Sequence, residues 1–225
     1  MAPKLENIRT QYHTFVDDQV LTAEQLNGFI HYFDDQDRVS RIFLTGVGIV
    51  CGFTLKEASA NAITLTQGVG VTTDGDLLTL REPVSGGAQK NIRLRELTFS
   101  YYRAYEDKSA RYPLFEREGE PMELWELLPE ENENALPLEK LTDLKGMTLL
   151  LYLETFSNEG DLCTVIDCDN QGTEQVERLR LLLVSKRDAA YIAQHDTIFS
   201  KYAVEQKLEQ LPDLTVRRVV LNPAN

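Results

Sequence analysis

Near the N-terminus, apolar residues follow the period of an amphipathic helix. The apolar positions lie three and four residues apart, and they are Leu26, Phe29, Ile30 and Phe33. Thr22 and Gln25 have the spacing of a capping box, in which each side chain satisfies a backbone amide at the start of a helix. The pattern predicts a helix over 23–41, preceded by an arm over 1–20.

The next part of the chain, up to residue 99, has the alternation of apolar and polar residues that is typical of half-buried β-strands. The predicted strands are 46–55, 62–66, 69–73, 76–80 and 91–99. Asp74-Gly75 falls between two of these strands and favours a tight hairpin turn. This part is therefore expected to form an antiparallel sheet.

The last third of the chain combines strand and helix patterns. The predicted elements are strands over 147–156, 176–184 and 214–221 and a helical segment over 186–211. Arg178 and Arg180 are expected to face outward from their strand. The whole pattern predicts an α+β fold, mainly antiparallel β with an N-terminal helix and a C-terminal helical segment.

Acidic residues are concentrated in the segment 116–145. Ten acids stand there against three basic residues, which accounts for more than half of the net charge of −13. Pro121, Pro129 and Pro137 interrupt regular structure. The composition predicts an acidic connector, either as a solvated loop or as a docking arm that buries its apolar residues against a partner. Those apolar residues are Met122, Leu124, Trp125, Leu127 and Leu128.

These patterns divide the chain into four parts. The expected parts are an N-terminal arm (1–20), a helix plus β-hairpin module (21–100), the acidic connector (101–145) and a second α+β module (146–225). Because a predicted strand runs almost to Asn225, we expect the second module to continue into a longer protein.

Composition narrows the classes of function. The chain is 42% hydrophobic and 26% charged, which fits a globular protein and not a disordered one. A net charge of −13 argues against binding of nucleic acid or of an anionic membrane surface. No apolar run approaches the roughly 18 residues of a membrane helix, so direct membrane insertion is not expected. Three cysteines and a polar first segment favour a reducing compartment, the cytoplasm.

The motifs of common enzymes are missing from the sequence. Gly46-Val47-Gly48 follows a predicted helix and lacks the context of a dinucleotide loop, so its glycines are read as sites of close backbone approach. No phosphate-binding loop and no nucleophile elbow is present. His13, His31 and His195 lie far apart, and Cys51 reads as a small core residue. We therefore expect no enzyme and no cofactor.

The segment 163–172 is the strongest candidate for a metal site. The candidate ligands are Cys163, Asp167, Cys168 and Asp169. The spacing of its acids approaches that of a calcium loop, but Arg178 occupies the place of the bidentate glutamate. Three readings stay open: free thiols in a turn, a local disulfide, or a metal site. The first is preferred, so no metal site is assigned.

Two blocks of sequence resemble a bacterial family. "DDQVLTAEQLNGFIHYFDDQDRVSRIFLTGVGIVCGFTL" followed by "AITLTQGVGVTTDGDLLTL" resembles the opening module, and "LCTVIDCDNQGTEQVERLRLLLVSKRDA" resembles a second block. The family is linked to contractile injection systems: phage-tail-like particles and the type VI secretion machines of Bacteroidetes. The resemblance covers about half of the chain. It implies a structural or adaptor subunit near the baseplate, the fibre attachment or the cap.

The resemblance also implies partners and a place of assembly. The partners would be baseplate, sheath, tube or fibre proteins in a symmetric multi-subunit particle, assembled in the cytoplasm and then released or docked at a membrane. The expected interface residues are Leu26, Phe29, Phe33, Asp34, Asp35, Leu124, Trp125, Leu127 and Leu128. The alternative is a ligand- or glycan-binding fibre module, which needs exposed aromatics in one groove; its candidates are Tyr101, Tyr102, Tyr105, Tyr112 and Trp125. A metal-binding enzyme is less favoured.

Overall fold

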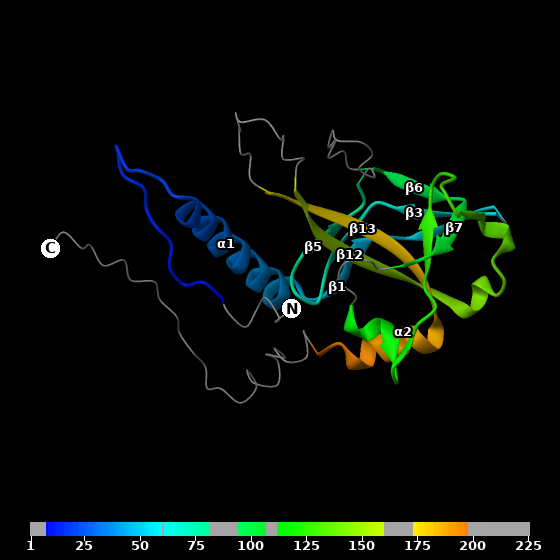
Figure 1. Cartoon of the computed structure of the whole chain (residues 1–225). Coiled ribbons are helices and arrows are strands. Elements are labelled where there is room, and N and C mark those ends of the chain that lie inside the picture. Colours follow the sequence, from blue (N-terminus) through cyan, green and yellow to red (C-terminus); the bar gives the residue numbers. More distant parts are fainter. Residues whose placement is uncertain (1–7, 60, 82–93, 107–111, 160–172, 198–225) are drawn as a thin grey trace.

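The computed structural model describes residues 8–59, 61–81, 94–106, 112–159 and 173–197 (Figure 1). Its helices are α1 (Ala23–Ser40) and α2 (Lys186–His195), with a π-helical turn η2 (Arg41–Thr45) and 3-10 turns η3 (Pro113–Phe115), η4 (Leu138–Lys140) and η5 (Leu144–Gly146). Its strands are β1 (Gly48–Gly52), β2 (Leu55–Ser59), β3 (Ala62–Thr66), β4 (Gly68–Val71), β5 (Leu77–Thr79), β6 (Glu96–Phe99), β7 (Tyr101–Ala104), β8 (Glu116–Arg117), β9 (Glu120–Pro121), β10 (Trp125–Leu128), β11 (Leu136–Pro137), β12 (Met147–Glu159) and β13 (Thr173–Ser185). All pairings among these strands are antiparallel, and the predicted α+β fold class is confirmed.

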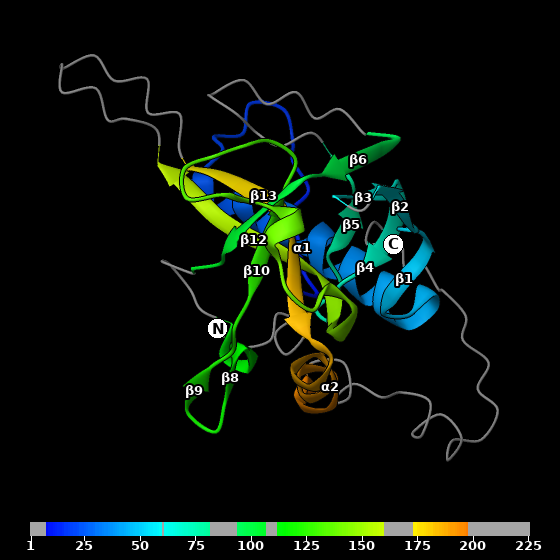
Figure 2. The same cartoon turned by 90° about the vertical axis from the view of Figure 1, so that its right-hand side faces the viewer.

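The described strands form four sheets. The largest has the order β11-β7-β10-β13-β12, and its two longest strands, β12 and β13, pair over thirteen residues each. Two three-stranded sheets, β1-β4-β5 and β2-β3-β6, come from the first half of the chain, and β8-β9 is a small hairpin. Figure 2 shows α2 and the strands β1–β5 lying on different sides of β13. The molecule is thus layered around the five-stranded sheet.

Two apolar clusters lie on opposite faces of the five-stranded sheet. Alternate residues of β13 divide between them, because successive side chains of a strand point to opposite faces. The first cluster joins this sheet to the strands of the first half and contains Phe53, Leu65, Leu78, Leu80, Phe99, Tyr102, Leu127, Leu138, Leu181 and Leu183. The second packs under α2 and η3 and contains Phe115, Leu124, Leu182, Val184 and Ile192. The predicted modules 21–100 and 146–225 therefore share one core.

The prediction of a connector over 101–145 is wrong for its strands. β7, β10 and β11 come from this segment, and β10 pairs with β7 on one side and β13 on the other. Leu127 is only 3% exposed. The physical reason is that Glu126, one of the acids counted as solvated charge, is neutralised by arginines from both neighbouring strands. Charge counting along the chain does not register such cross-strand pairs.

The N-terminal helix begins as predicted. Thr22 Oγ1 accepts the backbone N–H of Gln25 at 3.3 Å, and the backbone N–H of Thr22 donates to Gln25 Oε1 at 3.1 Å, which completes the capping box. The α-helix ends at Ser40, and the chain continues through η2 to Gly46, which has a φ of +91°. The helix and its start signal are thus confirmed.

The predicted strand 46–55 is divided into β1 and β2 by a sharp bend. Gly52 has a φ of +68°, and it pairs with Gly68 of β4. A Cβ on Gly52 would lie 2.2 Å from the carbonyl oxygen of Gln67, so the backbones approach closely here. The close approach predicted for Gly46 and Gly48 is wrong, because nothing lies within 4 Å of a Cβ added at either residue. Cys51 is exposed, which corrects its reading as a core residue: the bend turns β1 away from the core.

This close approach makes a prediction about stability. Gly52→Ala is expected to lower the free energy of unfolding by about 3 kcal/mol, the sum of left-handed backbone strain and a clash of the added Cβ with the backbone of Gln67 and Gly68. Gly119→Ala is the matched control, because Gly119 also has a positive φ, +86°, but nothing lies within 4 Å of an added Cβ. Urea unfolding followed by circular dichroism measures both; equal losses would contradict the account.

The elements that were predicted for the last third of the chain agree with the structure over part of their length. β12 extends through Glu159, beyond the predicted 147–156, and β13 contains the predicted 176–184. Arg180 does not face solvent as expected, since its side chain is 15% exposed and is paired with two glutamates. α2 covers the first part of the predicted helix 186–211. The predicted strand 214–221 lies outside the described residues.

Candidate docking surface

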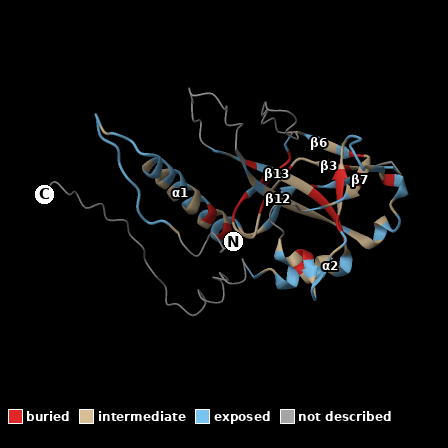
Figure 3. Cartoon of the chain, in the orientation of Figure 1, coloured by how far each residue is buried: buried red, intermediate tan, exposed pale blue. Residues whose placement is uncertain are grey.

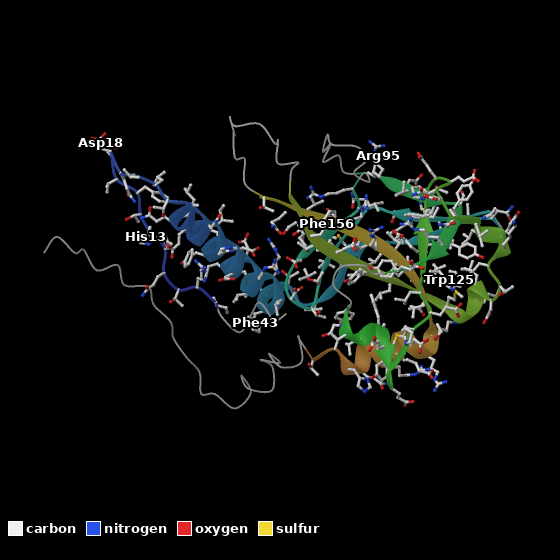
Figure 4. All side chains as sticks on the ribbon, in the orientation of Figure 1. His13, Asp18, Phe43, Arg95, Trp125 and Phe156 are labelled. Atoms are coloured by element: carbon white, nitrogen blue, oxygen red, sulfur yellow. The ribbon has the colours of Figure 1, made fainter. Side chains whose placement is uncertain are left out.

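Residues 8–45 form an N-terminal spike that projects beyond the sheets (Figure 1). The arm before α1 runs back along the helix, with Asp18 at the tip and Phe43 at the base (Figure 4). Among the residues of α1, burial is confined to Arg38 near the C-terminal end (Figure 3). The sheets therefore contact the base of the spike and leave most of its length uncovered.

An aromatic cluster holds the arm against the helix. Tyr12 lies 4.7 Å from Tyr32 and Phe15 lies 5.6 Å from Phe29, measured between ring centroids. Phe33 packs on Phe29 at 4.8 Å. Stacks and edge contacts of this kind each add roughly 0.5–1.5 kcal/mol beyond area burial. The arm thus covers part of the aromatic face of α1.

Arg38 fixes the base of the spike to the β4–β5 turn. Its side chain is 4% exposed, and its Nε lies 2.9 Å from Asp34 Oδ2, one helical turn earlier. Its Nη1 donates to the backbone carbonyl of Asp74 at 3.1 Å, and its Nη2 is paired with Asp76. Arg41 Nη1 adds a bond to the carbonyl of Gly75 at 3.0 Å. The helix direction is therefore set by charge pairing at the hairpin turn.

The pKa of Arg38 reflects this pairing. Burial by itself would lower the pKa of the guanidinium, but the hydrogen bonds and negative charges of Asp76 and Asp34 raise it above its ordinary value. Arg38 is therefore a permanent cation that is held between two carboxylates. It acts as a structural anchor.

Large apolar side chains remain exposed over the spike and the adjoining β1. Ile30 is 61% exposed and Leu44 is 85% exposed. The full set is Tyr12, Phe15, Val16, Val20, Leu21, Leu26, Ile30, Phe33, Phe43, Leu44, Ile49 and Val50. Single exposed apolar residues are ordinary, but a group gathered over the spike and β1 makes this region the candidate docking surface. We call this set the spike surface.

The helix residues that the sequence assigned to an interface are divided by the structure. Leu26 and Phe33 are exposed on the spike surface, at 43% and 48%. Phe29 is half-buried under the arm. Asp34 pairs with Arg38, and Asp35 Oδ2 accepts the backbone N–H of Arg9 at 2.8 Å. The two acids therefore hold the spike together. The Asp34–Arg38 pair lies within one helical turn, whereas the Asp35–Arg9 contact joins residues 26 apart, which the sequence pattern does not show.

The predicted interface residues of the acidic segment lie in the body. Leu124 and Leu127 are 7% and 3% exposed, and Trp125 and Leu128 are half-buried. Trp125 packs edge-on against Tyr102 at 5.4 Å. The interpretation of this segment as a docking arm is corrected for these residues, because their apolar area is already covered by this chain's own sheet.

The aromatic residues proposed for a glycan groove do not gather in one. Tyr102 and Trp125 belong to the first apolar cluster, whereas Tyr105 and Tyr112 pack in the second. Tyr112 donates to Asp196 Oδ2 at 2.8 Å, and burial together with that carboxylate raises the pKa of its hydroxyl. These rings serve packing on opposite faces of the sheet.

A half-buried charge network crosses the five-stranded sheet. Glu126, 4% exposed, accepts from Arg103 Nη2 at 2.7 Å and is paired with Arg180, whose Nη2 lies 2.8 Å from Glu154. Burial would lower the pKa of Arg180, but the two glutamates raise it. Burial and the charge of Arg180 lower the pKa of Arg178. Both carboxylates are held by arginines across strands, so the loss of one member would leave buried charge without its full compensation.

The metal candidates Cys163, Asp167, Cys168 and Asp169 lie outside the described residues. Within the described ranges, no group of three or more histidine, cysteine or acidic side chains is arranged to hold a metal ion. No helix in the same ranges is both long and apolar enough to cross a membrane. No protein-family model matches the chain, and no curated protein matches it in sequence.

Proposed function

We propose that the chain is a non-enzymatic structural subunit of a phage-tail-like contractile injection particle, and that its spike surface docks on a neighbouring subunit. The exposed spike surface is the single observation that carries the docking part of this proposal. The two sequence blocks described above support the class of particle. The position in the particle would be the baseplate, the fibre attachment or the cap, with assembly in the cytoplasm.

The geometry of the spike suits a role in assembly. Its base is fixed by Arg38, so the helix presents its exposed side chains in a set direction. A rigidly held apolar element loses little conformational freedom when a partner covers it. The contact expected is that of an amphipathic helix in an apolar groove.

The charge of the spike indicates what charge the partner surface should carry. Residues 8–45 contain six acidic residues and three basic ones. A partner groove that is apolar at its centre and bordered by lysine or arginine would complement it, with the charges contributing mainly to orientation and association rate. We therefore expect a protein partner among the sheath, tube, baseplate or fibre subunits.

Ile30→Asp is expected to prevent this docking. A charge at the centre of an apolar contact costs about 2 kcal/mol or more, so recovery of the partner should fall by about thirtyfold. The measurement is affinity capture of the tagged full chain from the native cells, with quantitative mass spectrometry of sheath, tube, baseplate and fibre subunits.

Leu136→Asp is the matched control, because Leu136 is 44% exposed but lies in β11, away from the spike. It adds the same charge and should leave recovery unchanged. An eluate without any contractile-particle subunit would overturn the particle assignment. Recovery of such subunits by the Ile30→Asp chain at the level of the original chain would overturn the docking surface.

A further inference from the structure

An apolar groove of about 350 Å³ lies where the first half of the chain meets β12 and α2. The first half contributes Val47, between η2 and β1, and Thr73, in the β4–β5 turn. β12 contributes Thr148 and Leu150. Ligand pockets begin at roughly 300 Å³, so this volume restricts the occupant to a small molecule or to about one large side chain.

One face of α2 completes the groove with mostly short side chains. Ala189, Ile192, Ala193 and Asp196 follow one another at spacings of three and four residues, up to the C-cap, and therefore lie on the same side of the helix. Because an alanine side chain ends at Cβ, Ala189 and Ala193 leave space between this helix face and β12. Ala193 is exposed, so the groove is open to solvent along this wall.

The helix that forms this wall is fixed at both ends. At its start, Ser185 Oγ accepts the backbone N–H of Asp188 at 3.1 Å, and the carboxylate of Asp188 is paired with Arg117. At its end, the hydroxyl of Tyr112 donates to Asp196 Oδ2 at 2.8 Å. The groove is therefore preformed, and little conformational freedom is lost when an occupant enters it.

The charge of the groove indicates what kind of occupant it favours. Among the described residues that line it, Asp196 is the one with a charged side chain, and it stands at the end of the helix wall. A carboxylate beside an apolar surface suits an occupant that joins an apolar stem to a cation. Lysine and arginine side chains have this composition. The same residues are expected at the border of the partner groove that binds the acidic spike.

The groove adjoins the spike surface at Val47. This residue lies three positions after Leu44, which is 85% exposed, and two positions before Ile49, which is 60% exposed. Residues 42–55 contain no charged side chain. A partner that covers the base of the spike therefore reaches the groove across an uncharged surface.

We propose that the groove receives a lysine or arginine side chain of the neighbouring subunit that binds the spike surface, with the stem between α2 and β12 and the cation beside Asp196. The inference rests on the proposed function, because it assigns a second contact to the same partner. A contact with the spike alone leaves the partner free to turn about the axis of α1. A second contact at the groove fixes its orientation.

n-Hexylamine tests the chemistry of the groove without the partner, because it joins an apolar chain to a cation. In the full chain it is expected to shift the amide NMR signals of Leu150 and Ala193, and to bind about threefold to fivefold more tightly than n-hexanoate, which Asp196 repels. Asp196→Asn should remove most of this preference, while its remaining oxygen can still accept from Tyr112. Equal binding of the two probes, or shifts confined to residues outside the groove, would overturn the proposal.

Ala193→Trp tests occupancy by the partner, because the new ring fills the groove from an exposed helix position. Recovery of the neighbouring subunit in affinity capture should fall about tenfold. Ala190→Trp is the matched control: Ala190 is also exposed on α2 but does not line the groove, so recovery should stay unchanged.

The capture experiment separates the groove contact from the spike contact. Full recovery by Ala193→Trp, together with a loss for Ile30→Asp, would overturn the groove contact and leave the spike contact in place. A loss for Ala193→Trp with full recovery by Ile30→Asp would support the groove and overturn docking at the spike. An eluate without any particle subunit would overturn the partner named here together with the proposed function.

Discussion

Glu126→Gln is expected to lower the free energy of unfolding by about 3 kcal/mol, because Arg103 then loses its buried carboxylate and Arg180 keeps only Glu154. Glu126 pairs with both Arg103 and Arg180, which come from the strands on either side of β10. Glutamine keeps the shape of the side chain, so the loss reports charge and hydrogen bonding and not packing.

Glu96→Gln provides the comparison for this prediction. Glu96 pairs with Lys56 at 3.3 Å, but both side chains are more than half exposed. Exposed pairs of this kind are worth at most about 1 kcal/mol, so the control should change stability very little. Urea unfolding of the two variants and the original chain measures the difference. Similar losses for both variants would show that the Glu126 network is as weak as a surface pair.

Arg38→Met is expected to destabilise the chain by a similar amount, about 3 kcal/mol, because it leaves Asp76 buried without its cation. Methionine preserves the apolar stem of the side chain and helix propensity, so the effect isolates the guanidinium. Asp76 is only 8% exposed, and the carbonyl of Asp74 also loses its donor. The base of the spike should therefore loosen together with the β4–β5 turn.

Arg41→Met tests whether the effect belongs to Arg38 in particular. Arg41 also bonds to the turn, at the carbonyl of Gly75, but its side chain is 30% exposed and its partner Asp37 is 68% exposed. Its loss should cost about 1 kcal/mol. Thermal unfolding by calorimetry compares the two variants. A loss for Arg41→Met as large as that for Arg38→Met would contradict the assignment of Arg38 as the anchor.

The parts of the fold that sequence reasoning predicted depend on neighbours in the chain. Thr22 and Gln25 are three residues apart, and the capping box that they form needs no information from elsewhere. The Asp74-Gly75 turn between β4 and β5 is local in the same way. The long apolar and alternating runs that became β12 and β13 are also read within one segment.

The parts that could not be predicted depend on partners far away in the chain. β10 became an interior strand because Glu126 meets Arg103 and Arg180, which lie 23 and 54 residues away. The bend at Gly52 depends on the approach of Gln67, which lies between β3 and β4, and of Gly68, the first residue of β4. Neither contact leaves a periodic pattern in the sequence. An acidic, proline-containing segment therefore looked like a connector although part of it is core.

The candidate surface was predicted in part. Helical spacing identified Leu26 and Phe33, which are exposed on the spike surface. Val16 and Val20 of the arm were not named individually as interface residues, because they stand among polar residues without a period. Leu44 was not named because it lies between the predicted helix, which ends at residue 41, and the predicted strand, which begins at residue 46. Exposure of an apolar residue is a property of the folded chain, and the sequence indicates only that the residue is apolar.

Hydrogen exchange of the full chain, alone and bound to the subunit that affinity capture identifies, tests the central claim most directly. The account predicts that binding slows amide exchange in the spike, residues 8–45, and in β1, while exchange in β10 and β13 stays unchanged. Slower exchange confined to the five-stranded sheet, with the spike exchanging as in the free chain, would contradict the claim that the spike surface is the docking site.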